Sequence, residues 1–287
     1  MRVLFLGHTG VGDHIILNGL VHRFLQTTED VEELRIVAAD DYRKHTLIHL
    51  YEDYPSVTFY WLKKKDSSFD PEDPVLQQLD CRPEGTPVVI DGITYLGIPF
   101  GLHSPRKCYW LNSGASWIDC LYKFPLGYDC EQRFEDFRLP SDLSRASALY
   151  ETVCERIGSL NYVVVHDDPS RNRNADPETL RHLLAKDDLL TTPVLYLGFK
   201  RYSYPLIEGL VNPDMGTLFE VHSLLDLLVL LRNAKACHLM DSSIACLVDC
   251  ANLQGKLYMH NYINEASGYG FTRTPWVQVD KIKGSTG

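Results

Sequence analysis

The N-terminal segment constrains the fold of this chain most strongly. Residues 2–6 form a short apolar run of strand type, residues 7–12 are rich in glycine, and residues 15–24 carry apolar side chains at helical spacing. A strand, a glycine-rich turn and a helix in this order are typical of the first part of an open α/β sheet. The turn then lies at the carboxyl end of the strand, where ligands bind close to backbone N–H groups and the helix N-terminus.

A phosphate-binding P-loop does not fit the residues that follow these glycines. Gly7 and Gly12 have the spacing of the G-x-x-x-x-G-K-[ST] pattern. Asp13 and His14, however, stand where that pattern has a lysine and a hydroxyl residue. A carboxylate at the lysine position repels the phosphates that a lysine would hold.

The dinucleotide-binding pattern G-x-G-x-x-G fits only in part. It begins at Gly10 and Gly12, but Ile15 occupies the third glycine position. The isoleucine side chain there hinders close packing of the helix on the strand. Asp40, at the end of the second predicted strand, could imitate the acid that binds a ribose in such proteins.

A catalytic carboxylate is the third interpretation of the turn. Asp13 would lie at the mouth of a cleft, and both the neighbouring His14 and the helix N-terminus would favour its ionised form. The alternative is that Asp13 only stabilises the start of the helix, where acids interact favourably with the dipole. The residues alone leave both interpretations open.

The charge balance narrows the class of partner. The 287 residues include 28 basic and 38 acidic side chains, a net charge of −10, which argues against nucleic acid or an anionic membrane as the main partner. No apolar run approaches the roughly 20 residues needed to span a bilayer. The N-terminus enters the first strand without the apolar core of a signal peptide. These features predict a protein of the cytoplasm that takes a small or neutral polymeric substrate.

The eight cysteines do not indicate a metal site. They include no C-x-x-C pair and no His/Cys spacing of zinc type, so no structural metal is expected. Cys246 and Cys250 are four residues apart on a predicted helix and are interpreted as small core residues.

The rest of the chain predicts two consecutive α/β series. Strands alternate with helical stretches, which is the pattern of parallel sheets with covering helices. The expected strands are residues 2–6, 34–39, 57–62 and 87–90, then 161–165, 193–197, 236–240 and 256–260. The expected helices of the second series are residues 177–185, 224–232 and 242–251.

A helix-like stretch joins the two series and sets the expected domain boundaries. Residues 141–157 end at Gly158, which suits a helix C-cap and a hinge. We therefore expect domains at residues 1–142 and 159–287, with residues 143–158 as the connecting helix. Residues 94–140 are irregular and aromatic, and their rings either stack on a sugar or pack in the core.

Three polar loops of the second series are expected at one rim of its sheet. Asp241 caps a predicted helix whose first N–H groups, around Ser242 and Ser243, suit an anion, although an ordinary cap without ligand fits equally. Arg171 and Arg173 follow a strand and either clamp a diphosphate or are simply solvated. The third loop, residues 198–202, adds cations and rings.

Two segments resemble the heptosyltransferase-like glycosyltransferases, which use nucleotide-diphosphate sugars. Residues 10–20 resemble the family's N-terminal G-D-x-[IV]-x-x-x-P-x-[LI] segment, and residues 233–247 are similar to its A-x-x-x-[IV]-x-x-D-[ST]-G-x-x-H-[IL]-A-A segment. The resemblance implies an α/β protein of GT-B architecture: two facing Rossmann-like domains with parallel sheets and a cleft between them. It also implies a donor bound by the C-terminal domain, and neither a metal nor another cofactor.

The chain departs from the family pattern at several positions. Ser243 stands where the family has glycine, Cys246 where it has histidine, and His238 where it has isoleucine or valine. The usual proline of the first helix is replaced by Gly19 or its neighbour Asn18. A heptose donor is therefore not implied.

The resemblance assigns roles to individual residues. Asp13 would be the general base that takes the proton of an attacking acceptor hydroxyl, with His14 sharing the task, and transfer would proceed with inversion. The residues expected to bind the donor are Gly12, His166, Arg171, Arg173, Lys200, Asp241, Ser242 and Ser243. Those expected to bind a glycan or glycolipid acceptor are Asn18, Tyr95 and Trp117.

Two rival functions remain open from the residues. An NAD(P)-dependent oxidoreductase or epimerase of the short-chain type would use the glycine turn and a Tyr-x-x-x-Lys pair on one helix face. Tyr60 with Lys64, and Tyr196 with Lys200, have that spacing, but each pair begins in a predicted strand. A protein that binds a nucleotide or glycan without turnover is the other rival, because the family's histidine and glycine are absent.

Overall fold

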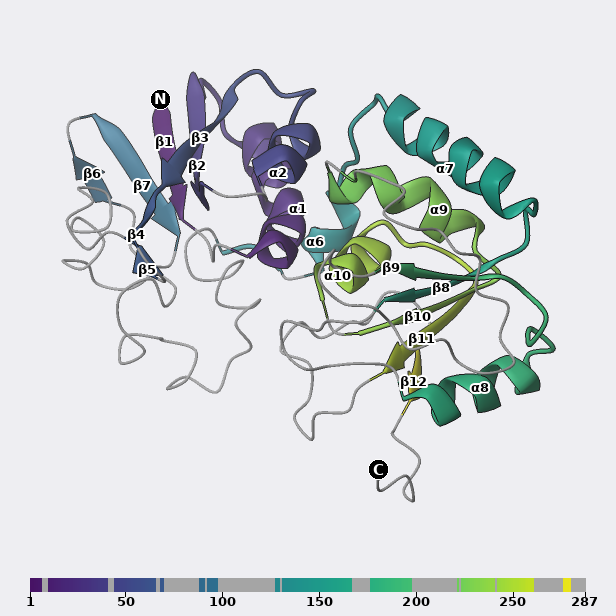
Figure 1. Ribbon diagram of the computed structural model, residues 1–287. Coiled ribbons are helices and arrows are strands. Elements are labelled where there is room, and N and C mark those ends of the chain that lie inside the picture. The colour runs from purple at the N-terminus through teal and green to yellow at the C-terminus, as the bar shows by residue number, and fades with distance from the viewer. Residues whose placement is uncertain are drawn as a thin grey trace. The chain divides into compact units, whose positions relative to one another are not determined.

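The computed structural model describes most of the chain and divides it into two compact units, Met1–Ser141 and Asp142–Gly287 (Figure 1). Each unit is an α/β structure built on one five-stranded sheet. The described residues are 1–6, 10–40, 44–65, 68–69, 88–90, 92–97, 127–129, 131–166, 176–197, 221, 223–240, 242–260 and 276–279. No helix in these ranges is long and apolar enough to cross a bilayer.

The first unit has the strand order β3-β2-β1-β7-β6. All neighbouring pairs are parallel except β6 with β7, which is antiparallel. The strands are β1 (Arg2–Leu6), β2 (Glu33–Ala39), β3 (Val57–Leu62), β6 (Val88–Ile90) and β7 (Ile93–Gly97), with the short hairpin β4 (Lys64–Lys65) and β5 (Ser68–Phe69). The described helices are α1 (Val11–Thr27), α2 (Lys44–Leu50) and α6 (Gln132–Glu135).

The path from β1 to β3 explains where α1 and α2 lie. Each strand lies beside the previous one in the same direction, and right-handed crossovers then place both helices on the same face of the sheet (Figure 1). The core between sheet and helices is apolar and closed, since Phe5, Ile15, Leu20 and Leu34 are all fully buried. This arrangement puts the start of α1 at the carboxyl end of β1.

Two features of this sheet differ from the sequence-based expectation. The strand at residues 88–90 is antiparallel to its neighbour, whereas a parallel sheet was expected. Residues 93–97, interpreted mostly as part of an irregular aromatic segment, form β7, which pairs with β1 along the whole strand. Residues 93–97 form a strand because they pair with the central strand β1. The glycines and prolines that follow them in the sequence gave the segment an irregular pattern.

The helix α1 is held closely against α6. A Cβ atom added to Gly19 would lie 2.7 Å from the Cα atom of Arg133 and 2.8 Å from two backbone oxygens of α6. The absence of a side chain therefore allows the two backbones to approach. The segment after α6 is attached to α1, because the Arg138 N–H donates to the Asn18 Oδ1 atom at 2.8 Å.

The second unit has a fully parallel sheet with the strand order β12-β11-β10-β8-β9. Helices cover both faces, with α8 on one side and α7, α9 and α10 on the other (Figure 1). The strands are β8 (Val163–His166), β9 (Val194–Leu197), β10 (Ala236–Leu239), β11 (Lys256–His260) and β12 (Val277–Val279). The helices are α7 (Ser144–Ile157), α8 (Pro177–Lys186), the 3-10 helix η3 (Leu224–Leu227), α9 (Leu228–Asn233) and α10 (Ser243–Cys250).

Local signals in the sequence account for the helix ends of this unit. Asp176 caps α8, because its Oδ2 atom accepts from the Thr179 N–H at 3.0 Å and the Thr179 hydroxyl at 2.8 Å, and Pro177 occupies the first turn. Gly158 ends α7 with φ 64°, a left-handed conformation that glycine adopts without strain. The unit boundary precedes α7, so this helix belongs to the second unit and packs on η3 and α9.

The cysteines that the structure describes are core residues. Cys154, Cys237, Cys246 and Cys250 are free thiols and all are buried. Burial raises the pKa of the Cys237 thiol to about 12, so it stays protonated.

Candidate active site

The acid after the glycine turn lies inside α1 rather than before it. The helix begins at Val11, so Gly12, Asp13 and His14 all belong to its first turn. Gly10 is the extended N-cap residue, and its N–H donates to the Asp13 Oδ2 atom at 3.0 Å. Asp13 thus satisfies a backbone donor and places negative charge at the positive end of the helix dipole.

Burial distinguishes these residues from an exposed pair of catalytic groups. Asp13 is only 3% exposed and the neighbouring His14 is 0% exposed. Residues 7–9, which precede the helix, lie outside the described residues. The structural role of the Asp13 carboxylate is therefore visible, and its role as a general base, shared with His14, stays a prediction.

Asn18, expected to contact an acceptor, is instead engaged inside the first unit. Its side chain is 0% exposed. Its Oδ1 atom accepts from the Arg138 N–H at 2.8 Å, and its Nδ2 atom lies 3.1 Å from the Nε2 atom of His22. These contacts tie α1 to the segment after α6, and reaching an acceptor would require breaking them. Acceptor binding by Asn18 stays a prediction that this geometry does not support.

The same cluster keeps His22 uncharged. The ring centroid of His22 lies 4.2 Å from that of Tyr54 and 5.9 Å from that of Tyr51. Burial, and to a smaller extent the nearby Arg138 guanidinium, together lower the pKa of His22 to about 4. A neutral imidazole beside the Asn18 amide is a structural element of α1.

In the second unit, two of the predicted donor-binding residues come together. His166 is the last residue of β8, and Ser242 is the N-cap residue of α10, which follows the adjacent strand β10. The Ser242 Oγ atom lies 3.4 Å from the His166 Nδ1 atom. Ser243 follows as the first residue of α10 and is partly exposed. The carboxyl ends of two neighbouring parallel strands thus place an imidazole beside a helix N-terminus.

The N-cap of α10 differs from the expected one. Asp241 was expected to cap this helix, but the N-cap residue is Ser242, and its side chain accepts no bond from the first turn. The first N–H groups of an α-helix have no partner within the helix, so an uncapped start favours an anionic ligand. Asp241 itself lies outside the described residues.

The structure gives less information on the remaining predicted site residues. Tyr95 lies on β7 opposite Leu4 of β1, in a strand rather than in a loop, and only its backbone is described. The other predicted site residues lie outside the described ranges: Trp117, Arg171, Arg173 and Lys200.

A buried histidine pair in the second unit was not expected from the sequence. The His238 Nδ1 atom lies 3.0 Å from the His260 Nε2 atom, and the His238 ring stacks on Tyr258 at 4.5 Å between centroids. Burial lowers the pKa of His260 to about 4 and that of His238 well below its ordinary value, so both rings are neutral. A histidine inside the apolar strand Ala236–Leu239 was the only signal for this pair.

The histidine pair is separate from the His166–Ser242 contact. His166 is in register with Leu239, so these two side chains lie on the same face of the sheet. His238 precedes Leu239 on β10 and is in register with Tyr258, and successive side chains of a strand point to opposite faces. The pair therefore lies on the other face of the sheet from His166. Among the residues that the structure describes, no group of three or more His, Cys, Asp or Glu side chains could hold a metal ion.

The structure gives no support to the oxidoreductase alternative. Tyr60 lies on β3 and Lys64 on β4, and Tyr196 lies on β9. A Tyr-x-x-x-Lys pair must share one helix face to act together, and a strand does not provide that spacing. Lys200, the partner of Tyr196, lies outside the described residues.

Comparisons with known proteins give a match in structure alone. No protein-family model and no curated protein matches the sequence. The glycosyl transferase family 9 structure from Veillonella parvula DSM 2008 is 10% identical, with a TM-score of 0.51, over 98% of this chain and 86% of that chain. The E. coli ADP-heptose lps heptosyltransferase II is 12% identical, with a TM-score of 0.54, over 96% of this chain and 90% of that chain.

The chain has the fold of these glycosyltransferases. The likeness extends over nearly the whole chain and so includes both parallel-sheet units. It confirms the α/β class and the GT-B-like architecture expected from the two sequence segments. At these identities the likeness establishes the fold, and the activity has to be argued from the site.

Proposed function

We propose that this protein is a glycosyltransferase that moves a sugar from a nucleotide-diphosphate donor to a hydroxyl group of a glycan or glycolipid acceptor. The observation that carries the proposal is the structural likeness to two sugar transferases over 96% or more of the chain. The residues of the two family-like segments support it, because they lie at the carboxyl ends of β1 and β10, where ligands of α/β sheets bind.

The second unit would bind the donor. The His166 imidazole, the Ser242 hydroxyl and the first N–H groups of α10 are hydrogen-bond donors suited to a diphosphate. Arg171, Arg173 and Lys200 would add positive charge on the loops that follow β8 and β9. Negative charge develops on the departing diphosphate, so donors fixed at that position lower the barrier to transfer.

The first unit would supply the base. The acceptor hydroxyl oxygen attacks the anomeric carbon on the face opposite to the diphosphate, and the bond to the nucleoside diphosphate breaks as the new glycosidic bond forms. The hydroxyl proton passes to the Asp13 carboxylate. A single displacement of this kind inverts the anomeric configuration, and the reaction as proposed uses no metal ion.

A donor panel tests the proposal. The purified protein is incubated with nucleotide-diphosphate sugars that vary in base and sugar, together with a mixture of glycan and glycolipid acceptors, in the presence and absence of EDTA, and released nucleoside diphosphate is measured. One donor is expected to be consumed, at the same rate with EDTA, and NMR of the product should show an inverted anomeric centre. Nucleotide binding without consumption of any donor would favour the non-catalytic alternative, and a retained configuration would exclude the single displacement.

A further inference from the structure

Two polar side chains of α1 lie inside the core of the first unit. Asn18 and His22 are four residues apart, so they share one face of the helix, and they are 0% and 1% exposed. Burying polar groups costs free energy unless they are hydrogen-bonded. The bonds that these two residues form therefore indicate their role.

The hydrogen bonds of Asn18 have only one possible direction. The Arg138 backbone N–H donates at 2.8 Å, so the atom of Asn18 that accepts it is the amide oxygen. The amide nitrogen lies 3.1 Å from the Nε2 atom of His22, and an amide nitrogen can only donate. His22 Nε2 is therefore the acceptor, and the neutral ring carries its proton on Nδ1.

Both ends of this chain of bonds are fixed. The His22 ring packs against the ring of Tyr54, in the segment that follows α2. At the other end, the Arg138 Nη1 atom donates to the carbonyl oxygen of Glu135 at 2.8 Å, which closes the segment after α6 on itself. Asn18 thus connects α1 to a segment that has its own internal bonds.

The first turn of α1 depends on how the middle of the helix is held. The helix is unbroken over Val11–Thr27, and an α-helix rises 1.5 Å per residue, so Asp13 lies about 7.5 Å along the axis from Asn18. A rigid helix carries a shift at Asn18 to Asp13. The bond from the Gly10 N–H to the Asp13 Oδ2 atom, at 3.0 Å, reports where that carboxylate lies.

We infer that Asn18 and His22 are positioning residues for the Asp13 carboxylate, because they fix where α1 lies against the segment after α6. Both act through the helix. Their effect on catalysis rests on the proposed function, in which Asp13 is the base. The placement of Asp13 does not rest on it, since the Gly10 bond can be followed without any substrate.

Histidine ¹⁵N NMR at neutral pH tests the direction of the bonds. In the wild type, the ring proton of His22 is expected on Nδ1. In Asn18→Asp the carboxylate oxygens still accept the Arg138 N–H but cannot donate to His22. The ring should then carry a proton on Nε2. A wild-type ring with its proton on Nε2 would overturn the inference.

Hydrogen exchange of the Gly10 amide in the full-length protein tests the positioning. Asn18→Leu and His22→Leu remove the bonds, and the Gly10 amide should exchange about 5-fold faster in both variants. His22→Gln offers an amide oxygen in place of the Nε2 lone pair and should restore the wild-type rate. Asn18→Asp keeps one bond of the two and should give an intermediate rate, which decides the test if a leucine variant does not fold. Wild-type exchange in all of these variants would overturn the inference.

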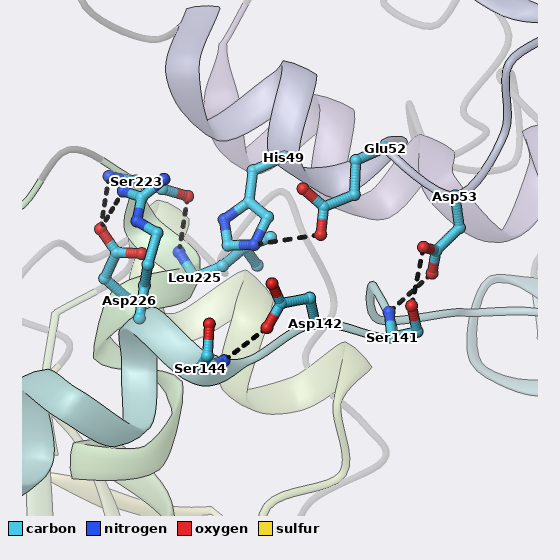
Figure 2. Close-up of polar contacts among 10 residues, drawn as sticks. His49, Glu52, Asp53, Ser141, Asp142, Ser144, Ser223, Leu225 and Asp226 are labelled. Carbon is cyan, nitrogen blue, oxygen red and sulfur yellow. Dashed lines mark hydrogen bonds and ion pairs between the residues drawn. The ribbon is translucent and has the colours of Figure 1, made fainter.

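Asp53 provides a matched control in the same unit. Its Oδ2 atom accepts the Ser141 N–H at 2.6 Å, and its Oδ1 atom accepts the Ser141 hydroxyl at 2.8 Å (Figure 2). Ser141 follows Arg138 by three residues, so Asp53→Ala removes bonds to the same segment but none to α1. Gly10 exchange should stay at the wild-type rate. Equal acceleration in Asp53→Ala would contradict a specific role of Asn18 and His22.

Steady-state kinetics on the donor that the panel identifies tests the catalytic consequence. A displaced base lowers kcat without weakening binding, so Asn18→Leu and His22→Leu should each lower kcat about 10-fold or more at unchanged KM for donor and acceptor. A raised acceptor KM in Asn18→Leu alone would overturn the inference and make Asn18 an acceptor-binding residue. If the wild type consumes no donor, the proposed function fails, while Gly10 exchange still decides the placement of Asp13.

Discussion

At the scale of single residues, Asp13 makes a structural contact and has a proposed chemical role. A substitution can keep the contact while removing the chemical role. Its Oδ2 atom accepts the Gly10 N–H at 3.0 Å. An asparagine retains an oxygen that accepts this bond, but its amide cannot take up a proton as a carboxylate does. The capping contact and the base can therefore be tested independently.

Asp13→Asn should leave the fold intact and abolish transfer. General bases contribute typically about 100-fold to 10,000-fold to a rate, so the loss should be at least ~100-fold. The thermal midpoint should stay close to that of the wild type, because the Gly10 bond can be kept. The comparison is made on the donor that the panel identifies, and turnover at the wild-type rate would refute the assignment of Asp13 as the base.

The buried neutral histidines should make the protein acid-sensitive. The pKa values of His22 and His260 are about 4 in the folded protein, against an ordinary value of 6.5. Below pH 6.5 the unfolded chain takes up protons that the folded protein does not, so stability falls as the pH drops from about 6.5 to about 4. Each histidine should contribute a loss of about 3 kcal/mol across that window, and nothing above it.

Urea unfolding at several pH values measures this effect. The free energy of unfolding of the wild type should fall between pH 7 and pH 5, and His22→Gln should show a shallower fall because it removes one of the titrating groups. If the variant loses stability with the same slope as the wild type, His22 is not among the groups responsible.

At the scale of elements, the approach of α1 to α6 depends on a missing side chain. Alanine is a better helix former than glycine by about 1 kcal/mol, so Gly19→Ala would stabilise an isolated helix. In the folded unit the added Cβ would lie 2.7 Å from a backbone atom of Arg133, which cannot rotate away. We expect a net loss of about 1–3 kcal/mol in the free energy of unfolding. Ser147→Ala, on the exposed side of α7, is the control and should change stability by less than about 0.5 kcal/mol.

Two serine N-caps should respond differently to alanine because only one forms a cap bond. The Ser223 Oγ atom accepts from the Leu225 N–H at 3.2 Å, whereas the Ser242 side chain caps nothing in α10. Ser223→Ala should therefore cost about 1 kcal/mol of stability and leave nucleotide affinity unchanged. Ser242→Ala should leave stability nearly unchanged and weaken the binding of a nucleoside diphosphate several-fold, measured by calorimetry. Equal affinities in the two variants would remove Ser242 from the donor site.

At the scale of the whole molecule, each unit has a core of its own. Leu180 of α8 is fully buried in a cluster with Val163, Val165 and Leu184, all from the second unit. Leu180→Ala should lower the stability of that unit by about 2–5 kcal/mol. Hydrogen exchange should become faster in β8, β10 and β11 while β1 to β3 keep their wild-type protection. Equal acceleration in both units would show that they unfold as one cooperative body.

The sequence predicted the elements that carry a strong local pattern. The strands at residues 2–6, 57–62 and 256–260 have the predicted bounds, and Gly158 ends α7 as expected. Continuous apolar runs and a glycine at a helix end are properties of a few neighbouring residues, so they can be seen without the fold. The α/β class and the two units built on mainly parallel sheets follow from the order of these elements, whereas the antiparallel pairing of β6 with β7 does not.

The site was predictable where position along a strand implies position in space. His166 and Ser242 lie in contact because His166 ends β8, Ser242 follows β10, and β8 and β10 are neighbours in a parallel sheet. Asn18 could not be placed in this way, since its burial depends on the segment after α6, more than a hundred positions later in the chain. The same is true of the His238–His260 bond.

The amino-acid sequence by itself determined most of the segments that form strands and helices, because those preferences act between residues close in the chain. The tertiary structure decided that residues 93–97 form a strand beside β1 and that the Asn18 side chain accepts the backbone N–H of Arg138. Each of these depends on backbone groups that must find a partner once they leave water, and the partner is set by what the fold brings near rather than by the neighbouring residues.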